Sequence, residues 1–367
     1  MTLLDLAFVV AAGFLAVQGV VALVNAGTFP RLTPVADRPK ARPRVSLLVP
    51  VRDEIATLPE TLTALLAQGA DEVLVLDDRS RDGSRALLDA AAATSPALRV
   101  LDGAELPPGW TGKNWACHQL AQAATGEVWI FTDADVHWRE GALDALLARW
   151  RVGEHAFASV WPRQRAIGWL ERIAVPQVDM ILIGGLPWPL VPRLPFPSLA
   201  AGNGQLMAWT PAAYRAAGGH AAVRDVVLED VRMAQRAKAA GVTPFLALGG
   251  ELVETRMYRS AGEVLDGFAK NVLPAAGSWP ALIVLVALNA LAYLAAWPLA
   301  LVEARWLLVA LSGVALRGGI AAVVGRSPAE ALLQPAAPLA LIAIVVRVAA
   351  RRGGYVWRGR RYARGRS

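Results

Sequence analysis

The sequence predicts a mixed α/β domain with a mostly parallel sheet, flanked by transmembrane helices at both ends of the chain. Between residues 45 and 272, short apolar runs alternate with helical segments, which is typical of parallel strands joined by right-handed crossovers. Of the 367 residues, 55% are hydrophobic, which is too many for a purely soluble protein of this size. The longest apolar stretches lie at residues 3–24 and beyond residue 280, so we expect membrane segments on both sides of the α/β domain.

Composition divides the chain into five parts. They are an N-terminal transmembrane anchor (1–26), a linker rich in proline and arginine (27–44), the α/β domain (45–272), a C-terminal transmembrane region (273–349) and a basic tail (350–367). The anchor lacks the basic first region and the clear cleavage site of a signal peptide. Positive charges follow it, from Arg31 to Arg44, so the positive-inside rule places the α/β domain on the cytoplasmic face of the cell membrane.

The C-terminal region raises a question of topology. Three further crossings are predicted, at residues 280–302, 306–325 and 331–349. Arg317 interrupts the second of these segments, and Pro335 and Pro338 interrupt the third. A cytoplasmic domain and a cytoplasmic tail require an even number of crossings between them. One of the three segments is therefore expected to be re-entrant or to lie in the membrane interface.

The net charge of +7 belongs to the C-terminal tail. Eight arginines between residues 347 and 366, with no acidic residue among them, account for it. Such a tail favours contact with an anionic membrane face, and no signature of nucleic-acid binding accompanies it. The single cysteine, Cys117, excludes an internal disulfide and a cysteine metal cluster. We therefore expect a membrane, and no nucleic acid, among the partners.

The elements of the α/β domain follow from local signals. A first strand covers residues 45–50 and is stopped by Pro50. Thr57 and Glu60 form a capping box for a helix that runs to about residue 68, with Pro59 in its first turn. Later strands are predicted at 72–76, 99–101, 128–131, 157–161 and 205–209, and later helices after residue 84 and at 113–124, 141–150 and 228–240.

Residues 181–200 differ from the rest of this domain, because they are apolar but broken by five prolines. This composition excludes a regular helix or a central strand. With Trp188 and Phe196 exposed, the segment suits the membrane interface, and an ordinary proline-rich loop is the alternative.

Two acidic pairs follow predicted strands, Asp77-Asp78 after the second strand and Asp133 with Asp135 after the fourth. Ligands of open α/β sheets bind beyond the carboxyl ends of the strands, so both pairs are expected at the binding site. Asp133 and Asp135 suit Mg²⁺ or Mn²⁺ beside phosphate oxygens, although capping of the following turn explains the same spacing. Asp77-Asp78 suits contact with a base or a ribose, or forms an acidic turn.

Four further residues are candidates for chemistry. Lys113 is one of four lysines in an arginine-rich chain and lies at a helix start, which suits contact with a phosphate or a base; a solvated surface lysine is the alternative. Glu229 and Asp230 also begin a helix, where the helix dipole favours acids, or they supply a general base. His220 is either a second base or a hydrogen-bonding residue of its loop.

Taken together, these residues resemble glycosyltransferase family 2, which has the inverting, Rossmann-like GT-A fold. The similar motifs are Val45 to Glu54 (first strand), Asp77-Asp78 (nucleotide-binding acids), Asp133-Ala134-Asp135 (Asp-x-Asp) and Glu229-Asp230 (catalytic pair). The resemblance covers residues 45–272. Within the family, three segments look like bacterial membrane-bound carotenoid (diaponeurosporenoate) and hopene-associated glycosyltransferases: Trp110 to Lys113, Gly202 to Gln205 and Trp357 to Tyr362.

The resemblance implies a role for each matched residue. Asp230 would be the catalytic base beside Glu229, and Asp135 would bind a divalent metal, Mg²⁺ or Mn²⁺. The implied substrate-binding residues are Pro50, Arg52, Glu54, Asp77, Asp78, Lys113, Asp133, Asn203 and Gln205. The implied reaction is one in-line displacement on an α-linked nucleotide sugar, which gives a β-glycoside.

The chain departs from the processive members of the family, because it lacks their Gln-x-x-Arg-Trp motif; after Asp230 it has only Arg256-Met257-Tyr258 and Lys270-Asn271. This absence favours transfer of one sugar. We therefore expect a multi-pass membrane hexosyltransferase that moves a sugar from a nucleotide-sugar donor, a UDP-sugar, to a lipid acceptor such as a carotenoid, a hopanoid or a glycolipid precursor. The alternatives are a polyprenyl-phosphate glycosyltransferase and, in a different class, a non-catalytic membrane scaffold or transporter.

Overall fold

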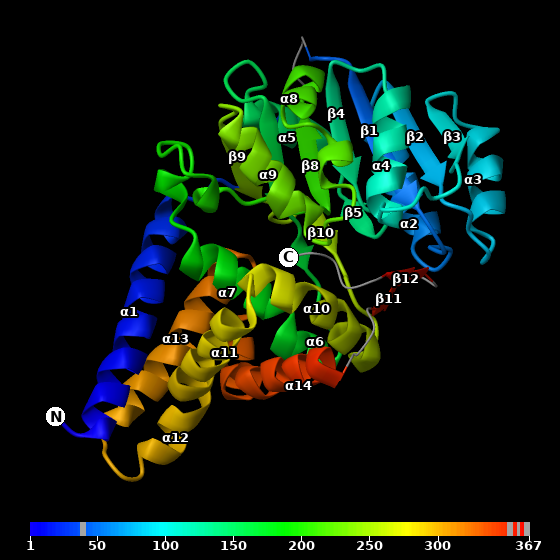
Figure 1. Cartoon of the computed structure of the whole chain (residues 1–367). Helices are drawn as coiled ribbons and strands as arrows, with labels where there is room; N and C mark the ends of the chain where they lie inside the picture. The colour runs from blue at the N-terminus through cyan, green and yellow to red at the C-terminus, as the bar shows by residue number, and fades with distance from the viewer. Residues whose placement is uncertain (37–41, 351–354, 358–359, 363–367) are drawn as a thin grey trace.

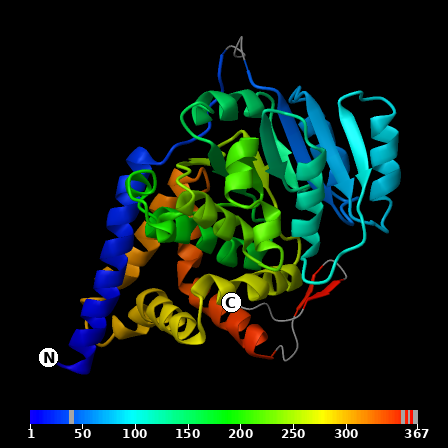
Figure 2. The same ribbon diagram turned by 45° about the horizontal axis from the view of Figure 1, so that its top comes forward.

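The computed structural model describes residues 1–36, 42–350, 355–357 and 360–362, and the structural statements below concern these residues. The chain forms an α/β body and a second body of mostly apolar helices (Figure 1). The N-terminal helix and the C-terminal third of the chain belong to the helical body. The two bodies remain distinct when the molecule is turned by 45° (Figure 2).

A seven-stranded sheet forms the centre of the α/β body, in the order β3-β2-β1-β4-β8-β6-β9. Its strands are β1 (Val45–Val51), β2 (Glu72–Asp77), β3 (Leu98–Asp102), β4 (Val128–Thr132), β6 (Phe157–Trp161), β8 (Leu206–Trp209) and β9 (Pro244–Leu248). Strands β1 to β4 are parallel to their neighbours in this group, β8 is antiparallel to β4 and β6, and β9 is parallel to β6. The predicted mixed α/β fold with a mostly parallel sheet is confirmed.

Both faces of this sheet are buried under helices. In β1, Leu47 and Leu48 pack into hydrophobic clusters on opposite faces, because successive side chains of a strand point in opposite directions. One face is covered by α2 (Leu58–Leu66), α3 (Ser84–Ala92) and α5 (Ala142–Trp150), and the other by α4 (Gly112–Ala123), α8 (Pro211–Ala216) and α9 (Glu229–Ala239). Burial on both faces explains why these strands are continuous apolar runs rather than alternating ones.

The predicted capping box of the first of these helices is wrong. Thr57 makes no side-chain cap, and its hydroxyl lies 3.2 Å from the carbonyl oxygen of Glu54. The backbone at Thr57 is already helical, so its side chain does not face the free N–H groups of the first turn. The helix ends at Leu66, close to the predicted end.

A second sheet, of three short strands, joins parts of the chain that lie far apart in the sequence. None of its strands was predicted from the sequence. It consists of β5 (Val136–Trp138), β10 (Val253–Thr255) and β7 (Arg163–Gln164), in that order. These strands are too short for a periodic signal in the sequence. Because β5 follows Asp135 directly and β10 lies shortly before Tyr258, their pairing brings distant segments together at the carboxyl edge of the main sheet.

The helical body contains the predicted membrane segments. Its helices are α1 (Leu3–Thr28), α6 (Trp169–Ala174), α7 (Pro176–Gly185), α10 (Ala261–Ala276), α11 (Trp279–Asn289), α12 (Ala296–Leu299), α13 (Trp306–Val323) and α14 (Ala337–Ala350). Four segments of the described chain are long and apolar enough to cross a membrane: Leu3–Thr28, Trp279–Leu299, Trp306–Val323 and Pro328–Ala350. The predicted apolar segments are therefore largely helical.

The carboxyl end of the N-terminal helix is attached to α7, and the segment after it to the α/β body. The side chain of Asn25 donates hydrogen bonds to the carbonyl oxygens of Ile183 and Leu186, at 2.9 and 2.8 Å. The segment after the helix then pairs with the edge strand β9, where the Leu32 N–H donates to the Leu248 carbonyl oxygen at 2.9 Å. The first residues of the predicted linker are thus held by backbone hydrogen bonds, and residues 37–41 of it lie outside the described residues.

Residues 181–200 are partly helical, which corrects the prediction. Helix α7 continues to Gly185, and two 3₁₀ turns follow at Trp188–Leu190 and Pro197–Leu199. The helix is possible because the five prolines begin only at Pro187, beyond its end. Phe196 is exposed as expected, but Trp188 is half-buried against Phe29, with ring centroids 5.5 Å apart.

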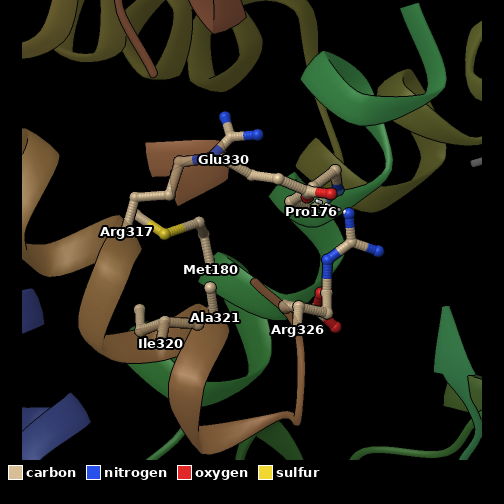
Figure 3. A pocket seen from close by; sticks show the side chains of 8 residues that line it. Pro176, Met180, Arg317, Ile320, Ala321, Arg326 and Glu330 are labelled. Atoms are coloured by element: carbon tan, nitrogen blue, oxygen red, sulfur yellow. Dashed lines mark hydrogen bonds and ion pairs between the residues drawn. The ribbon is translucent and has the colours of Figure 1, made fainter. Parts of the chain in front are cut away.

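Arg317 does not interrupt α13, because both of its terminal guanidinium nitrogens are hydrogen-bonded inside the helical body. Its guanidinium donates to Gln334 Oε1 at 2.8 Å and to the Arg172 carbonyl oxygen at 2.5 Å. A cavity of about 10 Å³ lies beside it, and Figure 3 shows the lining side chains of Pro176, Met180, Ile320, Ala321, Arg326 and Glu330. The cavity has room for about one water molecule, so it is part of the packing between α7 and α13.

Helix α14 differs in direction from the other candidate spans. Helices α1 and α13 run along each other, whereas α14 is steeply inclined to them (Figure 1). It packs against α10, where Arg347 Nε lies 2.6 Å from Asp266 Oδ1. Of the predicted basic tail, β11 (Tyr355–Trp357) and β12 (Arg360–Tyr362) form an antiparallel hairpin, and residues 351–354, 358–359 and 363–367 lie outside the described residues.

Candidate active site

The predicted site residues meet at the carboxyl edge of the main sheet. Strands β1, β2 and β4 are parallel neighbours, and Val51 pairs with Asp77 in the register of β1 and β2. The residues that follow these three strands therefore emerge at the same edge. Helix α10 lies between this edge and the apolar helices (Figure 1).

The loop after β1 is tied to the loop after β2. Arg52 Nη1 donates to the Asp78 carbonyl oxygen at 2.6 Å and lies 3.8 Å from Asp78 Oδ2. Asp53 adopts a left-handed backbone with φ 53°, and its Oδ1 accepts a hydrogen bond from the Arg81 N–H at 2.7 Å. Pro50 lies inside β1, beside Leu76 of β2. These contacts fix the direction of both loops at the sheet edge.

The two acids after β2 have different surroundings. Asp77 Oδ1 accepts a hydrogen bond from the Ser80 N–H at 3.3 Å, which is the turn-forming role that the sequence left open. Asp78 is 5% exposed and lies beside Arg52, so an arginine partly balances its charge. Asp78 is thus the acid of this pair whose side chain faces the loop after β1.

Lys113 lies between two acids of the site, with 36% of its side chain exposed. Its Nζ is 2.7 Å from Asp133 Oδ1 and 3.3 Å from Glu229 Oε1, and it donates to the Gly204 carbonyl oxygen at 3.1 Å. Asp133 and Glu229 raise the pKa of Lys113 well above its ordinary value, although burial opposes them. Helix α4 presents the lysine there because Thr111 caps its first turn.

Asp135 lies in a cluster of negative charge. Burial, followed by the charges of Asp133 and Glu54, raises the pKa of Asp135 to about 7. The described residues contain no group of three or more histidine, cysteine or acidic side chains arranged to hold a metal. Two carboxylates beside an open edge nevertheless fit Mg²⁺ or Mn²⁺, because these ions bind through one or two carboxylates and complete their coordination with phosphate oxygens and water.

The loop before β8 connects this acidic cluster to α9. The Gly204 N–H donates to Asp230 Oδ2 at 2.8 Å, and a β-carbon at Gly202 would lie 2.6 Å from the Asp230 carbonyl oxygen. The predicted substrate ligands Asn203 and Gln205 hold this loop: Asn203 Oδ1 accepts from the Gln205 N–H at 2.9 Å, and Gln205 Oε1 accepts from Gln164 Nε2 at 3.0 Å. The Asn203 side chain is therefore engaged within the loop, and the Gln205 side chain is engaged by Gln164 of β7.

Asp230 has the environment of a carboxylate that titrates near neutral pH. Burial and then the charge of Glu229 raise the pKa of Asp230 to about 6, although hydrogen bonds from the Gly204 and Val231 N–H groups lower it. The two oxygens are held in place by those N–H groups, with the Val231 N–H donating to Oδ1 at 2.8 Å. A carboxylate with such a pKa, in fixed orientation, suits proton transfer near neutral pH.

His220 belongs to the core and not to the site. It is 1% exposed, its Nδ1 lies 2.8 Å from the Tyr214 hydroxyl, and its ring packs on Phe131. Burial lowers the pKa of His220 to about 3. Of the two predicted roles, the geometry supports that of a hydrogen-bonding residue of the loop.

Sequence reasoning assigned no role to Tyr258 and Lys270, which lie in the segment before α10 and in α10 itself. Tyr258 is 6% exposed, and burial and the charge of Asp135 raise its pKa. Lys270 lies within the electrostatic influence of Glu229, Asp133 and Asp230. The sequence of α10 is that of an ordinary amphipathic helix. It therefore marks neither residue as part of a site, apart from their position after Asp230.

Replacing Lys113 with methionine is expected to lower the stability of the protein by about 1–3 kcal/mol at pH 8, because a part-buried ion pair is broken and acids lose their counter-charge. The loss should be smaller at pH 5. Lys113 lowers the pKa values of Asp135 and Asp230, which remain at about 7 and about 6, so both acids are protonated at pH 5 and need no counter-charge.

The test is thermal unfolding of the full chain in detergent, followed by tryptophan fluorescence at both pH values. Arg224→Met, which removes an exposed cation, is the control. An equal change in Tm at both pH values would contradict the assigned charge balance.

The chain is similar to known proteins in both sequence and fold. Residues 46–215 match the family model described as "Glycosyl transferase family 2". The 4,4'-diaponeurosporenoate glycosyltransferase of Staphylococcus haemolyticus (strain JCSC1435) is 24% identical over 244 residues, which cover 64% of this chain. The match spans 62% of the length of that relative.

The fold is similar to that of solved structures. Mannosyltransferase PcManGT from Pyrobaculum calidifontis, in complex with GDP-Man and Mn²⁺, matches with a TM-score of 0.56 at 19% identity and covers 94% of this chain and 99% of its own. Glucosyl-3-phosphoglycerate synthase from Mycobacterium tuberculosis, in complex with Mn²⁺, UDP and its product, has a TM-score of 0.38 at 17% identity, over 67% of this chain and 88% of its own. The first similarity establishes a common fold, and the second is too remote to add to it.

Proposed function

We propose that this chain, whose residues 46–215 match glycosyl transferase family 2, is a glycosyltransferase that transfers one sugar from a nucleotide-sugar donor, a UDP-sugar, to a lipid acceptor at the membrane. The observation that carries the proposal is the position of the site. Asp133, Asp135 and Asp230 meet at the sheet edge, and α10 lies between that edge and the candidate membrane helices. The acceptor class proposed is a carotenoid, a hopanoid or a glycolipid precursor.

The donor would bind across the ends of β1, β2 and β4. Asp78, buried beside Arg52, would contact the nucleotide, and Asp133 and Asp135 would hold a divalent metal on its diphosphate. That metal would neutralise charge on the leaving diphosphate. The Mn²⁺ bound by PcManGT supports a metal of this kind here, and Mg²⁺ is the other ion that suits two carboxylates.

The acceptor would be activated by Asp230. In one in-line displacement, the acceptor oxygen forms a bond to the anomeric carbon while the bond from that carbon to the diphosphate oxygen breaks. The proton of the acceptor hydroxyl passes to Asp230, whose oxygens are oriented by the Gly204 and Val231 N–H groups. Glu229 raises the pKa of Asp230 and shares Lys113 with Asp133, so the proposed base and the proposed metal site are linked through one cation.

The helical body would anchor the enzyme with its α/β body in the cytoplasm. We propose that α1, α11 with α12, and α13 cross the inner membrane, and that α14 lies in the interface with α10. This arrangement gives two crossings after the α/β body, which is the even number that a cytoplasmic tail requires. The steep inclination of α14 to α13 supports it, as do the exposed apolar side chains of Trp169, Ile181 and Phe196.

The proposed boundaries of the parts remain those of the sequence: 1–26, 27–44, 45–272, 273–349 and 350–367. One modification follows from the packing. Helices α6 and α7 lie inside the 45–272 segment, but they pack with α14 and with α1 and α13, respectively. The α/β body and the membrane-associated body therefore share segments of chain.

The test is incubation of membranes that contain the full chain with a panel of radiolabelled nucleotide sugars and Mn²⁺, followed by lipid extraction. We expect label from one donor in the organic phase, and little label when EDTA is present. Label that appears only in a water-soluble polymer, or transfer that EDTA leaves unchanged, would contradict the proposal. Membranes that lack the protein are the control for endogenous transferases.

A further inference from the structure

Two buried glutamine side chains join β7 to the loop that precedes β8. Gln164 belongs to β7, Gln205 is the last residue of the loop, and Gln164 Nε2 donates to Gln205 Oε1 at 3.0 Å. Both residues are buried. Because a buried amide that loses its partner costs free energy, this hydrogen bond holds the two segments together.

The loop that ends at Gln205 contacts both acidic parts of the proposed site. The Gln205 carbonyl oxygen accepts a hydrogen bond from the Asp133 N–H at 3.1 Å. Its neighbour Gly204 donates its N–H to Asp230 Oδ2 at 2.8 Å and accepts from Lys113 Nζ at 3.1 Å through its carbonyl oxygen. A displacement of Gln205 would therefore move the N–H group that orients the proposed base.

The strand that carries Gln164 is itself fixed next to the proposed metal site. In the three-stranded sheet, Gln164 pairs with Thr255 of β10, and Thr255 pairs with Val136 of β5. The hydroxyl of Thr255 lies 3.2 Å from the carbonyl oxygen of Asp135 and donates to it. Gln164 is therefore aligned with the residue that directly follows Asp135.

The helical body holds Gln164 from the opposite direction. Arg326, shortly after the end of α13, donates through Nη1 to the Gln164 carbonyl oxygen and pairs through Nη2 with Glu330. Figure 3 shows the guanidinium of Arg326 directed toward the Glu330 carboxylate. The turn before Arg326 uses the left-handed backbone of Gly325, with φ 75°. The end of α13 is thus attached to the strand that carries Gln164.

We propose that Gln164 is a positioning residue for the base Asp230. It acts through Gln205, whose loop carries the N–H of Gly204 that orients the carboxylate. Arg326 anchors Gln164, so a segment of the helical body supports the geometry of the base. This inference rests on the proposed function, and it gives Gln205 a supporting role in place of the predicted contact with substrate.

The first test measures the loop directly and does not require activity. It is hydrogen exchange of the full chain in detergent, read by mass spectrometry on peptides that contain residues 202–206. Gln164→Met keeps the length of the side chain but removes its hydrogen-bonding amide. We expect exchange in this loop to become about tenfold faster, as for the loss of one buried hydrogen bond. Gln122→Met, at an exposed glutamine of α4, should match the wild type.

Two further variants test the path of the effect. Adding Gln164→Met to Gln205→Met should increase exchange little beyond Gln205→Met alone, because both changes break the same hydrogen bond. Arg326→Met should also speed exchange in residues 202–206, and it tests the same path if Gln164→Met does not fold.

The second test separates positioning of the base from stability of the fold. We expect Gln164→Met to lower kcat for lipid labelling about tenfold, with little change in the KM of the donor. The midpoint of kcat against pH should also move above the wild-type value near 6, because the Gly204 N–H lowers the pKa of Asp230 and would no longer be held in place. The charges of Glu229 and Lys113, which also act on Asp230, are the same in wild type and variant.

Each outcome bears on a different claim. Unchanged exchange in residues 202–206 of Gln164→Met would overturn the inference, whether or not the wild type is active. Faster exchange with unchanged kcat and midpoint would make Gln164 a structural residue only and would also overturn it. A raised donor KM in Gln205→Met, with the midpoint unchanged, would return Gln205 to the substrate-binding role. Wild-type protein that labels no lipid would count against the proposed function, and the exchange data would then decide the hydrogen-bonded path by themselves.

Discussion

Replacing Asp230 with asparagine is expected to lower kcat about 10²–10⁴-fold, the range of general base catalysis, with little change in the KM of the donor. Asparagine keeps the shape of the side chain and an oxygen for the Gly204 N–H, but it cannot accept a proton. The measurement is the initial rate of labelled lipid formation at saturating Mn²⁺. Asp225→Asn, an exposed acid shortly before α9, is the matched control.

The pH profile of the wild type gives an independent readout of the same residue. The pKa of Asp230 is raised to about 6, so kcat should rise with pH through this value as the base loses its proton. An Asp230→Asn variant with near-full turnover would contradict the role of Asp230 as the general base. It would favour an acceptor that is already ionised, such as a polyprenyl phosphate.

Replacing Asp135 with asparagine is expected to lower the rate about 10³-fold at a fixed Mn²⁺ concentration, because metal stabilisation of a leaving group contributes several kcal/mol. Part of this loss should be recovered at higher Mn²⁺, since Asp133 remains. The measurement is the rate as a function of Mn²⁺ concentration. Asp102→Asn, at the carboxyl end of β3, is the control because it removes an exposed acid from the same sheet edge.

The same variant should stabilise the protein in the absence of metal. Burial, Asp133 and Glu54 raise the pKa of Asp135 from 3.8 to about 7, so ionisation of this group destabilises the fold increasingly as pH rises from about 4 to about 7. Asparagine removes that effect, and the Tm of the metal-free variant should exceed that of the wild type at pH 8 and match it near pH 4. A Tm below the wild-type value at pH 8 would show that Asp135 is a structural residue.

The elements with strong local signals were predicted closely. The strand at 157–161 was predicted with its observed bounds, and the helix predicted at 113–124 agrees with α4 within one residue, because apolar runs and helix periodicity act over a few residues. The capping box at Thr57 failed because the motif gives residue types, whereas the cap depends on the backbone angles at Thr57. The helix at 181–185 was missed because five nearby prolines outweighed the apolar residues before them.

The acids of the site were found from sequence because each follows a strand or begins a helix. Their partners were not found in this way. The pairing of Lys113 with both Asp133 and Glu229 joins three segments separated by 20 residues or more, and no local pattern encodes it. Tyr258 reaches the edge only because β5 pairs with β10 and α10 packs against its ring.

The sequence by itself determined the fold class, the apolar segments and the acids Asp133, Asp135 and Asp230, because alternation of elements, hydrophobic length and strand-end position are local properties. Only the tertiary structure decided how the charges of those acids affect one another. Burial and mutual distance set the pKa values of Asp135 and Asp230, and both depend on contacts between segments far apart in the chain. The direction of α14 and the contact of Arg326 with Gln164 likewise depend on packing between segments far apart in the chain, which local propensity does not specify.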